Sequence, residues 1–300
     1  MVGSILALDL GGSHASTALI QCESPRKVSG FSFTNLDHSA PAEELLDRLR
    51  LLGMATIAAT GIAPEKISGI SIGVPNPFDY DSGISYMRHK YAGFYGMDMR
   101  SAIAKQFNMA SETITFVNDA SAFLLGELAS GIATDSKRTI GITLGTGIGS
   151  AFAIEGNIVM EGPNVPSGGF IWDLPYQGMM VEDFISSRAI QERYRRITSQ
   201  RLEVKEIAAR AMHDPHAADT FRQFGITLGR VLHSICGSFD PDMIVLGGGI
   251  ARSARWFLPA AQLQLADSRI RLRVSGLLDH ATLLGAANWW RRTAARAGTA

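Results

Sequence analysis

The apolar residues of this chain fall into short continuous runs and into longer stretches with helical spacing. Short runs of this kind are typical of buried strands, and the positions that predict them are residues 4–9, 15–21, 67–74, 114–117, 138–144, 150–155 and 243–246. Helical spacing predicts helices over residues 42–60, 98–107, 121–129, 180–196, 204–213, 217–239 and 283–295. Strands that alternate with helices in this way predict an α/β fold.

Two hairpins in the chain share one pattern, in which an apolar strand enters a glycine-rich turn and a second strand follows. The first hairpin spans residues 4–21 and the second spans residues 138–155. Dinucleotide-binding folds and phosphate loops of the GxxxxGK[ST] type place a helix after their glycines, so neither motif fits. The repeated hairpin instead predicts duplicated halves, each with its own sheet.

The composition leaves little reason to expect a polyanionic or membrane partner. Lys plus Arg and Asp plus Glu number 28 each, so no net charge favours nucleic acid or an anionic membrane surface. No apolar run approaches the roughly 18 residues that span a bilayer, and the first residues lack a signal-peptide pattern. Cys22 and Cys236 stand alone, which gives no disulfide framework and predicts buried core residues. We therefore expect a cytoplasmic protein with a small-molecule partner.

The first glycine turn places a carboxylate beside residues that suit a metal-linked polyphosphate. Gly11 and Gly12 let backbone N–H groups approach phosphate oxygens, Ser13 offers a hydroxyl, and Asp9 can hold Mg²⁺ through water. An ordinary tight hairpin with an exposed aspartate explains the same residues.

Two further glycine clusters follow apolar strands. Gly145, Thr146 and Gly147 form a turn with little side-chain bulk, which fits backbone N–H groups that face an anion. Gly248 and Gly249 follow the strand at 243–246, where an adenosine ring can lie against bare backbone. Structural turns, with close packing of strand on helix in the last case, account for the same glycines.

Asn118 and Asp119 follow the strand at 114–117 and precede a helix, so we expect them at a sheet end where ligands gather in α/β folds. A carboxylate there can accept the proton of an attacking hydroxyl in phosphoryl transfer, and Asn118 can bind a neighbouring hydroxyl. A helix cap is the alternative role for Asp119. His89, with Arg88 and Lys90, forms a small basic cluster that either contacts substrate or is a solvated loop.

Four segments in this order resemble the ROK family (repressors, open reading frames and kinases), which includes bacterial glucokinases. They are LALDLGGSHASTALI, FVNDASAFLLGE, ITLGTGIGSAFAIEG and DPDMIVLGGGIA, and they span nearly the whole chain. The resemblance implies an actin/hexokinase-like (ribonuclease H-like) fold of two α/β domains with a cleft between them. It also implies ATP held by the glycine turns, Mg²⁺, Asp119 as the base, and a homodimer. The expected domains are residues 1–117 joined by the C-terminal helix 284–300, and residues 118–283.

The chain departs from the family pattern at the sugar site. Where family kinases carry a Glu and a His three apart after a Gly pair, this chain has Phe170 and Asp173. The cysteine-rich zinc loop of the family is missing, so we expect no zinc site. Glu182 best matches the last family Glu that touches the sugar.

The sequence therefore predicts an ATP-dependent kinase that acts on a hydroxyl of a sugar or sugar-like polyol. Loss of the usual Glu and His predicts that glucose is a poor acceptor, and a seven-carbon cyclitol is one candidate. A noncatalytic binding protein or a sugar-responsive regulator of the same family is the alternative. Regulators of the family carry an additional N-terminal DNA-binding segment, whereas this chain begins its first strand within about five residues.

Overall fold

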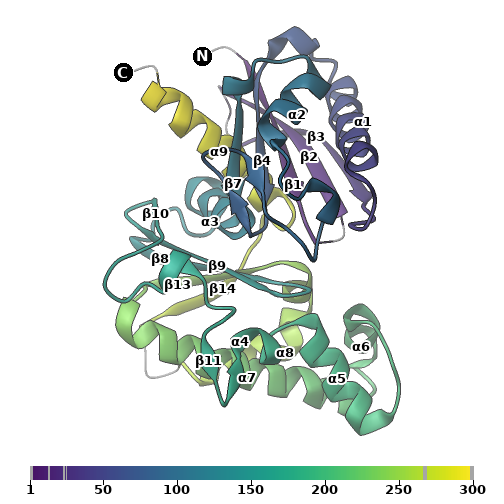
Figure 1. Ribbon diagram of the computed structural model, residues 1–300. Coiled ribbons are helices and arrows are strands. Elements are labelled where there is room, and N and C mark those ends of the chain that lie inside the picture. The colour runs from purple at the N-terminus through teal and green to yellow at the C-terminus, as the bar shows by residue number, and fades with distance from the viewer. Residues whose placement is uncertain (1–2, 13, 23, 25, 266–268, 298–300) are drawn as a thin grey trace. The chain divides into compact units, whose positions relative to one another are not determined.

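The computed structural model describes residues 3–12, 14–22, 24, 26–265 and 269–297, without the side chains of residues 236–238, 296 and 297. The chain forms two compact units (Figure 1). Unit 1 combines Met1–Gly131 with Asp279–Ala300, and unit 2 is Ile132–Leu278. Among the residues described, no helix has both the length and the apolar character needed to cross a membrane.

Unit 1 is built on a five-stranded mixed sheet. Three strands pair as an antiparallel meander, and two further strands add to it in parallel. The order across the sheet is β3 (Val28–Asn35), β2 (His14–Gln21), β1 (Ser4–Leu10), β4 (Ile67–Val74), β7 (Ile114–Asn118). The parallel strands β1, β4 and β7 all finish at the same edge, so residues that follow them lie near one another.

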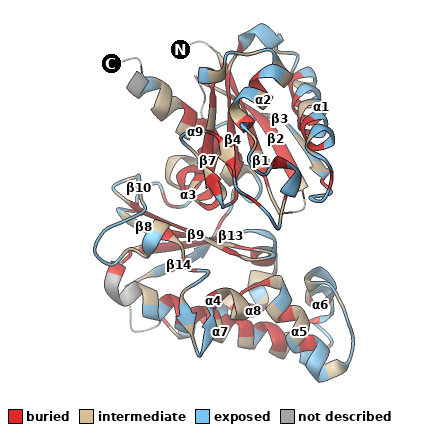
Figure 2. Ribbon diagram, in the orientation of Figure 1, coloured by how far each residue is buried: buried red, intermediate tan, exposed pale blue. Residues whose placement is uncertain are grey.

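The helices of unit 1 cover both faces of this sheet. Alternate residues of β1, including Leu6 and Leu8, pack with α1 (Ala42–Thr60) and α2 (Met99–Phe107) in one buried core (Figure 2). The opposite face is covered by α9 (His280–Ala297), against which α3 (Asp119–Ser130) packs. The sheet is therefore buried on both sides, which explains the nearly continuous apolar runs of β1 and β4.

The close approach of α3 and α9 assigns α3 to unit 1. A Cβ added to Gly126 would lie 1.9 Å from the Ala281 carbonyl oxygen, and one added to Gly285 would lie 1.7 Å from the Ala122 carbonyl oxygen. Glycine at both positions lets the two helix backbones touch. The first segment of unit 1 consequently ends at Gly131 rather than at the residue 117 expected from the sequence.

Unit 2 repeats the topology of unit 1. Its sheet has the order β10 (Asn157–Val159), β9 (Ile148–Ile154), β8 (Arg138–Leu144), β13 (Met243–Gly247), β14 (Arg271–Val274), again a meander extended by two parallel strands. The turn between the first two strands of each meander, β1 to β2 and β8 to β9, is the glycine-rich turn seen in the sequence. Residues Ile142 and Leu246 of this sheet pack in one core with Phe221 and Leu228 of α7 (Pro215–Phe239).

Several elements differ from the sequence prediction. The helix expected over 180–196 is two helices, α4 (Val181–Phe184) and α5 (Ser187–Thr198), because the Ser186 side chain accepts the Ala189 N–H and caps α5. Strands β3, β10 and β14 had no predicted counterpart. The remaining elements are α6 (Val204–Arg210), α8 (Ala254–Leu263), β5 (Phe78–Asp79), β6 (Ile84–Ser85), β11 (Pro175–Tyr176), β12 (Met179–Met180), and the short 3₁₀ turns Pro64–Lys66, Ala92–Phe94, Ser111–Thr113, Ser167–Gly169 and Gly249–Ser253.

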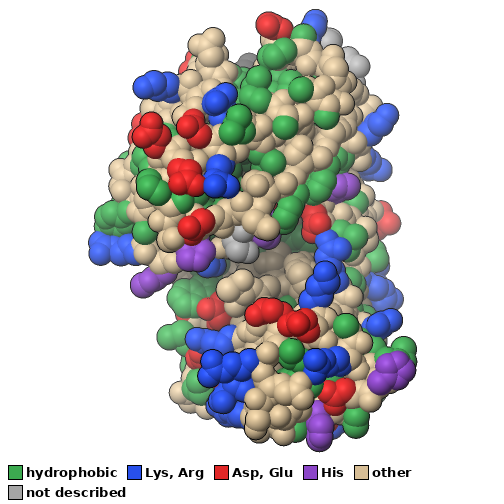
Figure 3. All heavy atoms as spheres, turned by 90° about the vertical axis from the view of Figure 1, so that its right-hand side faces the viewer, with side chains coloured by type: hydrophobic (Ala, Val, Ile, Leu, Met, Phe, Trp, Pro, Cys, Tyr) green, Lys and Arg blue, Asp and Glu red, His purple; other side chains and the backbone are tan. Residues whose placement is uncertain are grey.

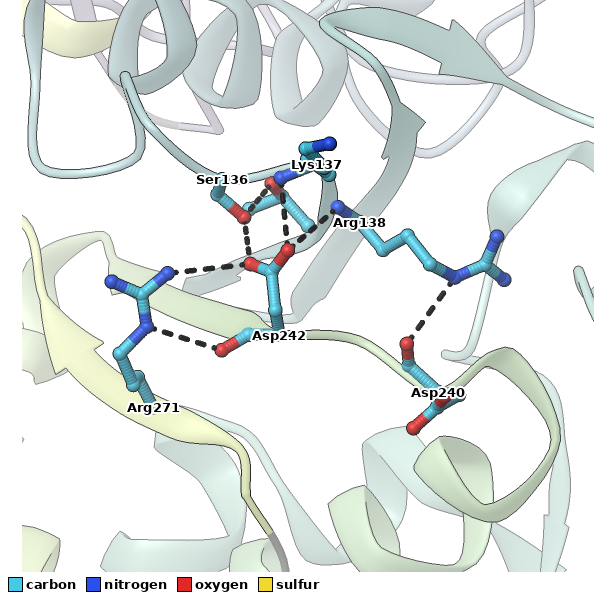
Figure 4. A network of polar contacts seen from close by, with 7 residues as sticks. Ser136, Lys137, Arg138, Asp240, Asp242 and Arg271 are labelled. Carbon is cyan, nitrogen blue, oxygen red and sulfur yellow. Dashed lines mark hydrogen bonds and ion pairs between the residues drawn. The ribbon is translucent and has the colours of Figure 1, made fainter.

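A polar network joins the starts of three strands in unit 2 (Figure 4). The Asp242 carboxylate accepts hydrogen bonds from the Ser136 hydroxyl and from the backbone N–H groups of Lys137 (2.9 Å) and Arg138 (3.1 Å). Arg271 lies 3.4 Å from the same carboxylate. Burial alone would raise the pKa of Asp242, but these donors outweigh it and hold the pKa below its usual value. The network lies at the opposite end of the strands from the glycine turns and is structural.

Candidate active site

Asp9 lies near the end of β1, at the edge where the parallel strands of unit 1 finish. It pairs with Gly73 of β4, and Gly73 pairs with Val117 of β7, two residues before Asp119. Adjacent strands are about 4.8 Å apart, so Asp9 and the end of β7 are separated by roughly 10 Å. Gly73 has no side chain to fill that interval, and the two carboxylates can face each other across it.

Asn118 and Asp119 divide two roles at the start of α3. The Asn118 side chain accepts the Ser121 N–H at 3.1 Å and is the helix cap. Asp119 is the first helical residue, and its Oδ1 accepts the Ala120 N–H at 2.8 Å and the Asn118 Nδ2 at 3.2 Å. The capping role proposed as the alternative for Asp119 thus belongs to Asn118. No other residue that the structure describes donates a hydrogen bond to the second oxygen of Asp119, Oδ2, which can therefore accept one from a ligand.

The electrostatics of this edge favour protonation of both carboxyl groups. Burial raises the pKa of Asp9 to about 7, with further contributions from the negative charges of Asp119 and Asp279. Burial also raises the pKa of Asp119, although the Ala120 N–H and the positive charge of Lys90 oppose the shift. The negative charges of ionised Asp9 and Asp119 together exceed the positive charge of Lys90. A divalent cation would offset this excess.

Two tyrosine hydroxyls, which no sequence motif marked, frame the same edge. The Tyr80 hydroxyl lies 3.0 Å from the Val74 carbonyl oxygen and accepts the Asn118 Nδ2 at 3.2 Å. The Tyr91 hydroxyl donates to the Gly11 carbonyl oxygen of the first turn at 2.5 Å. Burial raises the pKa of both hydroxyls, so they stay protonated and fix the two ends of the site.

The basic cluster near Tyr91 contributes through one member. Arg88 lies over the Tyr95 ring, 4.4 Å from its centroid. His89 is exposed, whereas Lys90 is partly buried and its charge acts on Asp119. Lys90 is thus the residue of the cluster that the structure connects to the candidate base.

The first turn is organised by His14, another residue that the sequence did not single out. The Gly11 N–H donates to the His14 carbonyl oxygen at 2.9 Å, and the His14 ring stacks on Phe33 with centroids 5.2 Å apart. A Cβ at Gly11 would lie 2.7 Å from His14 Cε1, so a side chain there would force the His14 ring to move. Gly12 belongs to the same turn, and Ser13 lies outside the described residues.

The second turn, in unit 2, is tied to the start of α5. The Gly145 N–H donates to the Gly147 carbonyl oxygen at 2.9 Å and closes the turn. The Gly145 carbonyl oxygen accepts both the Ser187 N–H at 2.9 Å and the Ser187 hydroxyl at 2.8 Å. Thr146, at the tip, is exposed. The turn is therefore rigid at its base and open at its tip, as an anion site would require.

Glu182 lies at this second turn. Its Oε2 accepts the Ile148 N–H at 3.1 Å and lies 2.1 Å from the place where a Cβ of Gly147 would stand. The residue is partly buried. Glu182, which the sequence predicts to touch the sugar, thus contacts the turn that is predicted to bind phosphate.

Phe170 and Asp173 lie on the loop between β10 and β11. The Ser150 hydroxyl of β9 donates to the Gly169 carbonyl oxygen at 2.7 Å and accepts the Ile171 N–H at 3.1 Å, which anchors this loop. The Phe170 ring packs over Gly168, and the Asp173 side chain is exposed. The loop is fixed at Phe170 and presents Asp173 to solvent.

The third glycine cluster lies next to the second turn because β13 and β8 are parallel and end together. Gly248 has φ +81°, and a Cβ there would lie 2.4 Å from the Leu144 carbonyl oxygen, so close backbone packing explains this glycine. Gly249 has no atom within 4 Å of its Cβ position. Of the two, Gly249 leaves open backbone on which a flat ring can lie.

The relationship of the chain to known proteins agrees with this arrangement. The ROK family model matches residues 5–293. The chain belongs to the ROK family. Its structure is similar to a ROK family glucokinase from Streptomyces griseus in complex with glucose and AMPPNP, with a TM-score of 0.80, 19% identity, and coverage of 97% of this chain and 100% of that one. The expected actin/hexokinase-like α/β fold is confirmed.

Two relatives found by sequence share a somewhat higher identity with the chain, over shorter matches. The chain is 27% identical over 165 residues to the N-acetylgalactosamine kinase AgaK of Shewanella sp. (strain ANA-3), a match that covers 48% of this chain and 52% of that enzyme. The chain spans about half the length of this relative. It is 24% identical over 260 residues to the glucokinase of Thermotoga maritima, which covers 75% of this chain and 79% of that enzyme.

Metal binding in this ROK family member has to be judged from its own residues. Within the described part of the chain, no three His, Cys, Asp or Glu side chains are grouped so that they could hold a metal ion. Mg²⁺ commonly uses one or two carboxylates, with waters and substrate phosphates as its other ligands. Asp9, with its raised pKa beside Asp119, fits that mode.

Proposed function

We propose that this protein is a kinase that transfers the γ-phosphoryl group of ATP to a hydroxyl group of a sugar, with Asp119 as the general base. The observation that carries the proposal is the placement of Asp119. Its carboxylate stands where the parallel strands of a mixed sheet end, beyond the cap made by Asn118, and burial raises its pKa. A raised pKa makes the ionised carboxylate a better proton acceptor, while the positive charge of Lys90 opposes the shift.

The proposed step needs a proton acceptor and a held phosphate. The acceptor hydroxyl donates to Asp119, its oxygen attacks the γ-phosphorus, the bond from that phosphorus to the β-phosphate oxygen breaks, and ADP leaves. The hydroxyl proton passes to Asp119. Asn118, whose Nδ2 lies 3.2 Å from both Tyr80 Oη and Asp119 Oδ1, holds the base in place.

The nucleotide is assigned to the glycine turns. Gly11 and Gly12 in unit 1, and Gly145 to Gly147 in unit 2, offer backbone to phosphate oxygens. Asp9 would hold Mg²⁺ through water, and the ion would offset negative charge on the phosphates. Gly249, with open space at its Cβ position, supports an adenosine site at the third cluster.

The acceptor is assigned to the loop that carries Phe170 and Asp173, together with Glu182. The relatives compared above are named for action on glucose and N-acetylgalactosamine, and they lend no support to a cyclitol. Phe170 offers an aromatic face in place of a hydrogen-bonding group. A buried hydroxyl without its partner costs about 1 to 3 kcal/mol, so we expect glucose to be a poor acceptor.

A screen for ADP release tests the proposal. The purified protein is incubated with MgATP and single hexoses, N-acetylated amino sugars, or cyclitols, and ADP is measured by a coupled assay. We expect one class of sugar to give turnover well above glucose. A kcat/KM for glucose above about 10⁴ M⁻¹s⁻¹ would contradict the assignment of Phe170 and Asp173.

The Asp119→Ala variant separates catalysis from binding. Positioned bases contribute about 10²- to 10⁴-fold, so turnover should fall by that factor while calorimetry still detects nucleotide binding. Asp81→Ala, at an exposed aspartate of the same unit, is the matched control. Turnover of the Asp119 variant within about tenfold of the parent would remove this residue as the base. Nucleotide binding without turnover on any acceptor would favour the noncatalytic alternative.

A further inference from the structure

The second glycine turn already holds an anion, which is a carboxylate of the chain itself. Glu182 Oε2 accepts the Ile148 N–H at 3.1 Å, directly after Gly147. The same oxygen fills the space beside Gly147 that a side chain would occupy, 2.1 Å from the Cβ position. A turn that presents N–H groups and space to a carboxylate presents them equally to a phosphate oxygen.

The neighbouring acid has a different and purely structural role. Asp183 Oδ2 accepts the Met180 N–H at 3.1 Å, and its Oδ1 pairs with Arg188 at 2.6 Å. Both Asp183 oxygens therefore have partners at the start of α4. Glu182 Oε1, by contrast, accepts no hydrogen bond from any residue that the structure describes. Only Glu182 is directed at the turn, and one of its oxygens is available to another donor.

We propose that Glu182 is a specificity-determining residue that excludes phosphate from the second turn until an acceptor hydroxyl draws its carboxylate away. This inference rests on the proposed kinase function. It adds that binding of the nucleotide depends on binding of the acceptor. Two anions that compete for one N–H group lie in contact, where their like charges repel each other. A phosphate at Gly147 and Ile148 must therefore displace the Glu182 carboxylate.

The backbone connects Glu182 to the loop on which the acceptor is expected to bind. The Glu182 N–H donates to the Trp172 carbonyl oxygen at 3.0 Å, between Phe170 and Asp173. The Val181 N–H donates to the Leu174 carbonyl oxygen at 3.0 Å. A ligand that orders this loop therefore acts on the backbone that carries Glu182. The acceptor can reach the carboxylate through Oε1 and through this backbone connection.

The thermodynamic consequence is a coupling between the two substrates. If an acceptor removes the carboxylate from the turn, it raises the affinity for nucleotide, and by linkage the nucleotide raises the affinity for the acceptor by the same factor. Without an acceptor, the turn stays closed to phosphate. The enzyme would thereby limit transfer of the phosphoryl group to water.

Calorimetry without acceptor tests the inference directly. The dissociation constants of AMPPNP, inorganic tripolyphosphate and adenosine are measured with Mg²⁺ for the parent, Glu182→Gln and Asp183→Asn. Gln retains an oxygen that can accept the Ile148 N–H, so the turn keeps its shape while the charge is lost. We expect Glu182→Gln to bind AMPPNP and tripolyphosphate about tenfold more tightly, because a charged carboxylate no longer competes with phosphate for the Ile148 N–H. Adenosine, which has no phosphate, should bind equally to all three proteins.

The controls distinguish this inference from the proposed function. Asp183→Asn removes the same charge one residue away. If both variants bound AMPPNP more tightly by the same factor, the cause would be the net charge near the turn, and the specific role of Glu182 would be overturned. Unchanged or weaker AMPPNP binding by a folded Glu182→Gln variant, with normal binding by the parent, would overturn the inference alone. Failure of the parent and both variants to bind any adenine nucleotide would refute the proposed function, and this inference with it.

Discussion

Replacing Asp9 by Asn should stabilise the free protein at alkaline pH and weaken its affinity for MgATP. Burial, with the charges of Asp119 and Asp279, raises the pKa of Asp9 from 3.8 to about 7. The folded protein therefore holds a proton that the unfolded chain releases between about pH 4 and pH 7. Because the folded state binds more protons in this window, the free energy of unfolding of the parent falls as the pH rises through it.

The size of the effect follows from the shift. Each pKa unit corresponds to about 1.4 kcal/mol, so a shift of roughly three units destabilises the parent by at most about 4 kcal/mol above pH 7. At pH 5 only the first part of the window has been crossed, and the corresponding limit is about 1.6 kcal/mol. Asn has nearly the same size as Asp and no charge to lose. We expect Asp9→Asn to gain about 2 kcal/mol more over the parent at pH 8 than at pH 5.

Urea unfolding at pH 5, 6, 7 and 8, without divalent cations, measures this difference. Asp135→Asn, at an exposed aspartate of unit 2, is the control and should track the parent at every pH. The same Asp9 variant should bind MgATP at least about tenfold more weakly, because it lacks the carboxylate that holds the ion. If Asp9→Asn and the parent differed in free energy of unfolding by the same amount at pH 5 and at pH 8, the inference that burial raises the pKa of Asp9 would be refuted.

Three further outcomes are expected. Gly147→Val fills the space beside the turn, now occupied by Glu182 Oε2 at 2.1 Å from the new Cβ, that a phosphate oxygen would need, and should weaken nucleotide binding at least about tenfold in calorimetry; unchanged affinity in a folded variant would make the turn merely structural. Asp242→Ala leaves the strand starts of unit 2 without their shared acceptor and should lower the free energy of unfolding by about 2 to 3 kcal/mol, against no change for Asp135→Ala. Chelator treatment should leave stability unchanged and elemental analysis should find no stoichiometric zinc, since residues 170–182 contain no Cys or His; one zinc per chain would contradict this.

Local signals in the sequence were enough to locate the glycine turns and the candidate base. Gly11, Gly145 and Asp119 each follow a buried apolar strand directly, and strand ends are encoded by a change from apolar to turn-forming residues within a few positions. The repeated hairpin also predicted two similar halves, and the two sheets share one topology. These features depend on contacts between residues close in sequence.

The edge strands were not predictable in the same way. β3 alternates partly buried and exposed residues and includes glycine, and β14 carries arginine at alternate positions. Their apolar content is too low to predict a buried strand from sequence. Each became a strand because the neighbouring strand offered hydrogen-bonding groups that needed partners, β2 for β3 and β13 for β14. That requirement exists only once the sheet has formed.

The sequence by itself determined which residue types stand at the ends of the strands, and therefore the family and the fold. Tertiary structure decided what surrounds them. The pKa of Asp9 depends on burial and on Asp119 and Asp279, which lie more than 100 residues away in sequence. The contact of Glu182 with the turn at Gly147 likewise depends on a loop folded back onto β9. Electrostatic and steric interactions act through space, so residues that are distant in the chain control the chemistry of a site whose parts are locally encoded.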